Sequence, residues 1–311
     1  MQPEKLVVHI DGKYVDTESV CVNNIQVIIS GSPLRVARVR EDWYEDVNDP
    51  SAIISALKEL DPRPDLFTFW QRLPDASPKY NYVMERESIA ALPVKSYEDW
   101  FQNHIGQDTR KLIRRAERKG VVVRICSFDE EFVKGMVRIF NESRIRQGRL
   151  FWHYGKDAET IKREFSRYLF REQILGAYFN DELIGFIFLA DAGRFGYLGQ
   201  IISMIDHRDK YPNNALMSKA VQVADERKIP FLAYGLWARG GLAEFKRRNG
   251  FERIDLPRYY VPLTIKGTLA LKLNAHRGAI GLVPEKLVPH LRKLRERWYH
   301  IKYGRNDPPP K

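Results

Sequence analysis

The chain has 311 residues and a net charge of +11 at neutral pH, from 51 Lys and Arg against 40 Asp and Glu. Its hydrophobic content of 44% is that of a globular protein with a core, which excludes a disordered chain. The two cysteines, Cys21 and Cys126, stand outside any Cys/His pattern. The sequence therefore predicts neither a disulfide framework nor a metal site.

The first 95 residues have the pattern of an α/β unit that is rich in strands. Strand patterns fall at 5–15, 25–39, 66–70 and 80–84. Residues 50–60 have the pattern of a helix, and we expect the last two strands to pair with each other. Residues 1–95 are therefore expected to form one domain.

A basic helix is predicted from residue 96 to residue 119, with Ser96 as its cap. Its second half carries six cations on two neighbouring rows, Arg110, Lys111, Arg114, Arg115, Arg118 and Lys119. Like charges at this spacing repel by about 0.2–0.5 kcal/mol per pair. The rows form either a solvated helix face or an anion-binding face, and both interpretations stay open. In the second, Arg114 and Arg118 contact tRNA or another polyanion.

The segment 146–156 follows a helix predicted at 131–145 and gathers cations, aromatic side chains and one histidine. His153 has a side chain that exchanges a proton near neutral pH, and it is either a reactive group or a structural one. Four further residues of the segment are candidates for binding a substrate, namely Arg146, Gln147, Trp152 and Tyr154.

Three strands are expected next, at 174–179, 183–191 and 196–203, and Asn180-Asp181 is a hairpin turn signal between the first two. Gln200 places an amide inside the third strand. It is either a substrate contact or a core amide with hydrogen-bond partners.

Residues 204–263 have the pattern helix, strand, helix, strand. Pro212 introduces the first helix, which Asn213 and Asn214 can cap, and Gly250 ends the second, which carries Lys246. Lys246 contacts a phosphate group or is a plain surface lysine. A basic amphipathic helix is expected from residue 284 and a frayed tail at the C-terminus, within a segment at 271–311.

Two stretches carry a resemblance to a known family. The segment 110–121, Arg-Lys-Leu-Ile-Arg-Arg-Ala-Glu-Arg-Lys-Gly-Val, is similar to the arginine-rich helix of Fem-type peptidoglycan aminoacyltransferases, and 241–251 is similar to their G-L-x-x-F-K helix. The unit at 204–263 resembles the cofactor half of a GNAT acyltransferase. The resemblance implies a mixed-sheet α/β fold of two tandem GNAT-like units, with 1–95 degenerate and 96–270 catalytic.

The donor-binding loop departs from the GNAT pattern R-x-x-G-x-G/A-x-x-L, in which bare backbone amides hold the pyrophosphate of CoA. Arg208 and Leu216 fit this pattern, but Tyr211 and Asn213 stand where the glycines belong. By resemblance, Arg208, Asn213, Asn214 and Lys246 bind the donor. Acetyl-CoA or another acyl-CoA is the usual donor of the superfamily, and aminoacyl-tRNA is the donor of the Fem branch.

The resemblance implies transfer of an acyl or aminoacyl group to the amine of a small molecule or peptide. For such a transfer, His153 is the candidate that takes a proton from the attacking amine and Gln200 the one that orients that amine. Tyr234, Tyr259 and Tyr260 are candidates for returning a proton to the leaving group, or they are packing residues. The cross-class alternative is a non-enzymatic protein that binds nucleic acid through the basic helix. The chain shows neither a signal peptide pattern nor an apolar run that could span a bilayer, so we expect a cytoplasmic protein.

Overall fold

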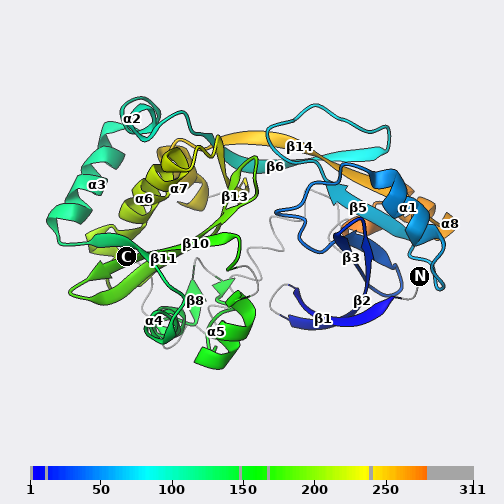
Figure 1. The fold of residues 1–311 in the computed structure, drawn as a ribbon, viewed down its shortest axis with the longest axis horizontal. Coiled ribbons are helices and arrows are strands. Elements are labelled where there is room, and N and C mark those ends of the chain that lie inside the picture. Colours follow the sequence, from blue (N-terminus) through cyan, green and yellow to red (C-terminus); the bar gives the residue numbers. More distant parts are fainter. Residues whose placement is uncertain (1–2, 11–12, 147–148, 167–168, 238–240, 279–311) are drawn as a thin grey trace. The chain divides into compact units, whose positions relative to one another are not determined.

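The structure is a computed structural model that describes residues 3–10, 13–146, 149–166, 169–237 and 241–278 (Figure 1). The chain forms two compact units. Unit 1 comprises Met1–Arg86, Ser143–Trp152 and Pro257–Lys311, and unit 2 comprises Glu87–Glu142 and His153–Leu256. The limits expected for the domains, at residues 95 and 270, stay a prediction. The helix expected from residue 284 lies outside the described residues.

Unit 1 is built on a sheet in which a meander leads into a parallel pair. Its strand order is β1 (Glu4–Ile10), β2 (Lys13–Val22), β3 (Ile25–Ser30), β4 (Val36–Val39), β5 (Leu66–Trp70) and β14 (Glu252–Pro262). The helix α1 (Pro50–Lys58) joins β4 to β5, which run parallel. Smaller elements are β8 (Ile145–Arg146), β9 (Arg149–Leu150), α8 (Ile265–Lys272) and a 3₁₀ turn at Ala275–Arg277. The expected pairing of 66–70 with 80–84 is wrong, because β5 pairs with β4 and β14.

Asp49 explains why α1 begins where it does. Its carboxylate accepts hydrogen bonds from the backbone N–H of Ser51 at 3.0 Å and of Ala52 at 3.2 Å, and Pro50 occupies the first helical position. The helix buries Ile53 and Leu57 in the core of the unit. Its first turn is therefore closed by a carboxylate of its own chain.

Unit 2 is built on a second run of strands. Their order is β6 (Val83–Pro93), β13 (Phe231–Leu236), β12 (Gly196–Ser203), β11 (Glu182–Asp191), β10 (Glu172–Phe179) and β7 (Val122–Cys126). The chain passes between the units within β6, within β14 and at both ends of Ser143–Trp152. All pairs of unit 2 are antiparallel except β12 with β13.

Helices cover both faces of the unit 2 sheet (Figure 1). One face carries α6 (Pro212–Glu226), with α3 (Gln107–Arg118) against it, and the other carries α4 (Glu130–Asn141) and α5 (Ala158–Phe165). Most apolar side chains of α6 are buried, because the helix lies between the sheet and α3. The last helix of unit 2 is α7 (Gly241–Arg248).

The basic helix expected from 96 to 119 is not continuous, which corrects that prediction. The chain forms a short helix α2 (Tyr97–Asp99), a π-helical turn η1 (Trp100–His104), an extended residue at Ile105 and then α3. Ser96 caps the first of these segments as expected, through a hydrogen bond from Asp99 N–H at 3.0 Å. Gly106 follows Ile105 and also has extended backbone, so the helix restarts there.

Two local predictions in unit 2 are confirmed. Asn180 and Asp181 form the hairpin turn with φ of 49° and 60°, the left-handed values that a two-residue turn of this kind requires. Gly250 follows α7 with φ of 82°, and Phe251 N–H donates to Lys246 O at 3.0 Å, which is the bond of a Schellman stop.

Candidate functional site

The parallel strands β12 and β13 separate soon after they meet. Only two residue pairs are in register, Gly196 with Leu232 and Tyr197 with Ala233. β12 then continues for six residues, to Ser203, without further pairing to β13. Beyond Tyr197, the backbone groups on that side of β12 therefore have no ladder partner in β13.

A β-bulge lies in the separated part of β12. Its register with β11 pairs Leu198 with Leu189 and Gln200 with Phe188, so Gly199 is the extra residue. A bulge reverses the alternation of side chains. Leu198 therefore packs in the core with α6, whereas Gln200 faces the side of α4 and α5, where it meets His153.

His153 is buried, with 1% of its surface exposed, and its ring stacks on Phe140 of α4 at a centroid distance of 4.2 Å. Its Nε2 lies 2.8 Å from Nε2 of Gln200, and its Nδ1 lies 3.3 Å from Nζ of Lys156. The structure thus brings two of the three predicted catalytic residues into contact. The roles given to them stay predictions.

A buried ion pair lies behind His153. Lys156 Nζ donates to the carboxylate of Glu164 on α5, and both side chains are only 10% exposed. Asn141 at the end of α4 holds the same turn, since its Nδ2 donates to Lys156 O at 3.1 Å and its Oδ1 accepts from Gly155 N–H at 2.6 Å. The pair was missed in the sequence because its two members lie on separate elements.

Tyr234 and Lys246 meet at the end of β13. Lys246 is 2% exposed, and its Nζ donates to the backbone oxygens of Tyr234 at 2.6 Å and Leu236 at 2.7 Å. Burial lowers the pKa of Lys246 to about 8, and burial raises the pKa of Tyr234 well above its usual value. Lys246 therefore caps the strand, and its ammonium is turned into the protein. Contact with a phosphate stays a prediction.

The first turn of α6 begins at Tyr211, which has left-handed backbone with φ of 58° and provides no side-chain cap. Its carbonyl accepts from the N–H groups of Asn214 and Ala215, and Pro212 has no N–H. Among the described residues the N–H of Asn213 has no partner, and neither does its buried Oδ1. This turn is thus open, unlike the first turn of α1.

Charged groups lie around this turn. Arg208, just before it, is exposed and makes no side-chain hydrogen bond or ion pair within the described chain. Glu142 at the end of α4 holds the loop in front, because its carboxylate accepts from Ile205 N–H at 2.7 Å and Asp206 N–H at 3.0 Å. Within the described residues, Arg208 is therefore a cation without a side-chain partner next to the open end of α6.

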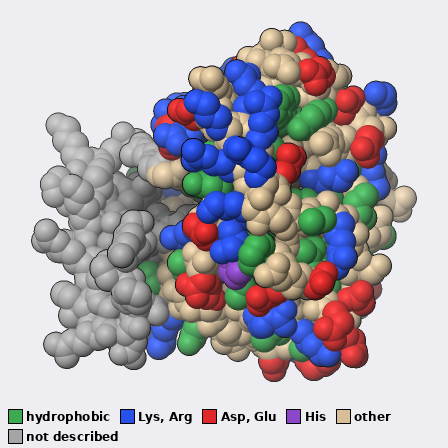
Figure 2. Space-filling model, turned by 90° about the vertical axis from the view of Figure 1, so that its left-hand side faces the viewer, with side chains coloured by type: hydrophobic (Ala, Val, Ile, Leu, Met, Phe, Trp, Pro, Cys, Tyr) green, Lys and Arg blue, Asp and Glu red, His purple; other side chains and the backbone are tan. Residues whose placement is uncertain are grey.

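Most cations of α3 lie on the surface of unit 2. Basic side chains gather on the upper part of the face that Figure 2 presents, which is the side of α3 in Figure 1. Arg110 is an exception, since its guanidinium donates to three backbone oxygens of 101–105 and so caps the π-helical turn. Arg114 lies over Phe101 at 5.5 Å and Arg118 contacts only a carbonyl of its own helix, so both remain exposed.

The remaining candidates belong to the segment 146–156, part of which lies outside the described residues. Arg146, in unit 1, stacks on Phe151 at 4.8 Å, and Gln147 lies outside the described residues. Trp152 and Tyr154 have 51% and 44% of their surface exposed. The segment 146–156 is in part a small hairpin of β8 and β9, and its role as an acceptor pocket stays a prediction.

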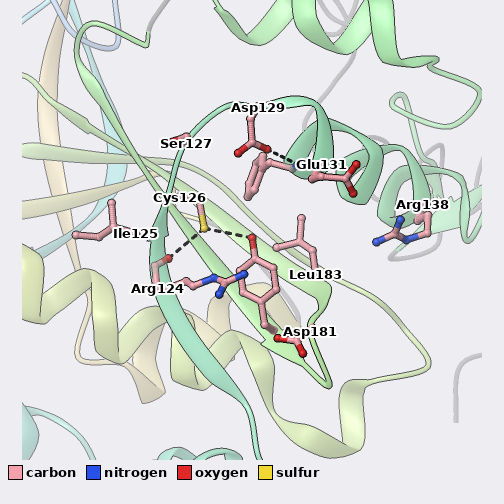
Figure 3. Close-up of a pocket in the computed structure, with 11 residues that line it drawn as sticks. Arg124, Ile125, Cys126, Ser127, Asp129, Glu131, Arg138, Asp181 and Leu183 are labelled. Atoms are coloured by element: carbon pink, nitrogen blue, oxygen red, sulfur yellow. Dashed lines mark hydrogen bonds between the residues drawn. The ribbon is translucent and has the colours of Figure 1, made fainter.

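A pocket of about 410 Å³ lies elsewhere in unit 2, between β7, the start of α4 and the turn before β11 (Figure 3). Arg124 stacks on Tyr178 at 3.9 Å, and Tyr178 Oη lies 3.4 Å from Sγ of Cys126. Burial raises the pKa of Tyr178 to about 12, and the hydrogen bond with Cys126 is the second cause of this rise. None of the predicted site residues lines this pocket.

The described part of the chain has neither a metal-binding cluster nor a membrane-spanning helix. It contains no cluster of three or more His, Cys, Asp or Glu side chains placed to hold a metal ion. No helix in it has the length and apolar character needed to cross a membrane.

No protein family model matches the chain, and no curated protein matches it in sequence. Its fold is similar to that of FemX, with a TM-score of 0.58 and 12% identity over 87% of this chain and 90% of FemX. It is also similar to the C-terminal domain of a putative lysylphosphatidylglycerol synthetase from Agrobacterium fabrum, with a TM-score of 0.57 and 11% identity over 82% and 87% of the two chains.

A third solved structure, L-PGS from Bacillus licheniformis, has a TM-score of 0.54 and 14% identity over 82% of this chain and 88% of that one. These likenesses confirm the fold expected from the sequence, a mixed α/β fold of the Fem-type, GNAT-like kind.

Proposed function

We propose that this protein transfers an acyl or aminoacyl group from an activated thioester or ester donor to an amine, and that the transfer takes place on unit 2. The observation that carries the proposal is the separation of β12 from β13 after two residue pairs, beside the open first turn of α6. An extended donor arm fits against β12 beyond its last pair with β13, as an added strand would.

The charges near α6 support an anionic donor. The helix dipole, the unpartnered N–H of Asn213 and the exposed guanidinium of Arg208 all favour negative charge at that end. Tyr211 and Pro212 leave fewer backbone amides than a glycine loop would provide. Side chains, Arg208 first, would therefore carry more of the phosphate recognition than in an ordinary acyl-CoA site.

The reaction needs an amine lone pair beside the donor carbonyl and support for the charge that develops on the carbonyl oxygen. Alignment of a deprotonated amine can supply much of the rate without a dedicated base. One neighbour in fold, a putative lysylphosphatidylglycerol synthetase, is named for a product that carries a lysyl group, which is consistent with aminoacyl transfer. The donor in this chain is acyl-CoA or aminoacyl-tRNA.

A binding and transfer assay tests the proposal. The protein is melted with acetyl-CoA, longer acyl-CoAs, aminoacyl-tRNA and uncharged tRNA, and the stabilising donor is then offered with labelled acyl group to amino acids and short peptides. A donor at 100 times its Kd stabilises the fold by about 2.7 kcal/mol. Formation of a labelled amide with equimolar release of thiol or uncharged tRNA is expected. Absence of binding and of product with every donor would contradict the proposal.

A second candidate function is binding of a polyanion without catalysis. The observation in its favour is the α3 face, where Lys111 and Arg115 are exposed and have no hydrogen-bond or ion-pair partner in the described chain. Binding of uncharged tRNA as tightly as aminoacyl-tRNA, with no acyl transfer, would favour this function.

A further inference from the structure

The two ring nitrogens of His153 each face another nitrogen, Nε2 of Gln200 at 2.8 Å and Nζ of Lys156 at 3.3 Å. A hydrogen bond between two nitrogens requires a lone pair on one of them. A ring turned by 180° would put carbon atoms against both polar groups, so the ring orientation is fixed by its neighbours. The protons of the cluster follow from this constraint.

Lys156 decides which ring nitrogen carries the proton. Its ammonium is paired with Glu164, and an ammonium only donates hydrogen bonds. Nδ1 of His153 must therefore accept from Lys156, and the ring proton of the neutral imidazole sits on Nε2. A second ring proton would face the ammonium at 3.3 Å, with a donor against a donor.

Gln200 must then turn its oxygen toward His153, because Nε2–H of the ring needs an acceptor. The amide turned by 180° fills the same volume. Before the turn, Gln200 Oε1 points away from the ring, where it is buried and has no hydrogen-bond partner in the described chain. The turn gives this oxygen a partner, the Nε2–H of His153. It also moves the NH₂ group to the position that the oxygen leaves, where it can donate to an acceptor atom. The acyl carbonyl oxygen of a bound donor would be such an acceptor.

We infer that Lys156, Glu164 and His153 are positioning residues that hold Gln200 with its NH₂ group ready to donate to the carbonyl oxygen of the donor's acyl group. The inference rests on the proposed function. Gln200 lies in the bulged part of β12, beyond its last pair with β13, which is where the donor arm is proposed to lie. His153 acts here through Gln200 and not as the base, because neither ring nitrogen has a lone pair for the amine.

The chemistry assigned to Gln200 is that of an oxyanion donor. The amine nitrogen attacks the acyl carbon, the C–N bond forms, and the carbonyl electron pair moves to the oxygen, where the Gln200 N–H donates to it. The pair then returns, the C–S or C–O bond to the carrier breaks, and the leaving thiolate or alkoxide takes the proton that the amine loses. Donors of this kind contribute about 10²–10³-fold to turnover.

The tautomer is measurable without a substrate. In protein labelled with ¹⁵N-histidine, the His153 resonances, assigned with His153→Gln, are expected to report a neutral ring with the proton on Nε2 at neutral pH. The variant Lys156→Met/Glu164→Gln removes the ammonium without leaving a buried carboxylate and should give a mixture of tautomers. A proton on Nδ1, or an imidazolium, in the wild type would overturn the inference. An unchanged tautomer in the variant would overturn it as well.

Kinetics test the donor group itself. Gln200→Glu replaces the amide with an isosteric carboxylate and should lower kcat by about 10²-fold, with the KM of the donor changed less than threefold. Lys156→Met/Glu164→Gln should lower kcat by a smaller factor, and Lys162→Met on the outside of α5 serves as the control. Wild-type kcat in Gln200→Glu would overturn the inference. Absence of transfer by a wild-type protein with the expected tautomer would instead contradict the proposed function.

Discussion

The same local arrangement occurs in both units, a helix that joins two parallel strands, but it is closed in unit 1 and open in unit 2. In unit 1 the strands β4 and β5 hold three residue pairs in register, and Asp49 fills the first turn of α1 with its carboxylate. In unit 2 the strands β12 and β13 hold two pairs, a bulge at Gly199 follows, and no side chain caps the first turn of α6.

The difference separates a turn that its own chain satisfies from a turn that leaves room for the proposed donor. A capped first turn has its amides satisfied and has no need of a ligand, whereas an open turn leaves a donor and a partial positive charge for an anion. β5 is buried along its whole length, while the later part of β12 is only half-buried. Unit 2 is therefore where we place donor binding, and the predictions below test that assignment.

The largest expected effect is a loss of tRNA affinity on reversing charges of α3, a helix of unit 2. Arg114→Glu/Arg118→Glu reverses two exposed cations, which should lower the affinity for tRNA by about 10²-fold at low salt and reduce the salt slope by about one per lost contact. Fluorescence anisotropy across a salt series measures both. The control reverses two exposed lysines of unit 1, Lys58→Glu/Lys272→Glu. Equal losses in the two variants would show that only net charge matters.

The next effect concerns the open end of α6. Arg208→Glu should weaken binding of the phosphate-bearing donor by about tenfold, on the scale of one charged hydrogen bond, with the melting temperature unchanged. Arg227→Glu makes the same charge change at the other end of the helix and should leave donor affinity as it is. Isothermal titration with the donor separates the two. If both variants bind like the wild type, the donor phosphate lies elsewhere.

A pH effect is expected at the end of β13. Burial lowers the pKa of Lys246 from 10.5 to about 8, so the unfolded chain binds more protons than the folded one between these values. The stability contributed by this group therefore rises with pH from 8 to 10.5 and is flat below 8. Urea unfolding of wild type and Lys246→Met across this range should show the difference growing in favour of the wild type. A constant difference would contradict the assigned burial, and Arg247→Met is the exposed control.

The smallest effect is expected in unit 1. Asp49→Ala removes the cap of α1 and should lower the free energy of unfolding by about 1 kcal/mol. Acyl transfer and donor affinity should stay at wild-type values, because the α1 turn is assigned to stability alone. Denaturant unfolding and the transfer assay are run on the same sample. A loss of donor affinity at unchanged stability would place part of the donor site in unit 1.

Signals that are local in the sequence predicted local structure correctly. The cap at Ser96, the turn at Asn180-Asp181 and the stop at Gly250 each depend on residues that lie within a few positions of one another. The break of the basic helix near Ile105 was missed, because its apolar stripe continues through the break. The partners of β5 were also missed, since pairing depends on strands far apart in the chain.

The candidate site was predictable only in part for the same reason. His153 and Gln200 were singled out by residue type, and the structure places them in contact. The bulge at Gly199 that turns Gln200 to this side is a matter of register, which the sequence does not reveal. Lys246 matched a family pattern, but its burial against the carbonyls of β13 depends on how α7 packs.

Amide hydrogen exchange with and without bound donor tests the assignment of donor binding to unit 2 most directly. The donor is the one found by thermal shift, and the compared amides are those of Asn213–Ala215 and of the later half of β12 against Ser51 and Ala52 of α1. We predict protection of α6 and β12 with no change in α1. Protection at α1, or none at α6 and β12 while the donor is bound, would contradict the account.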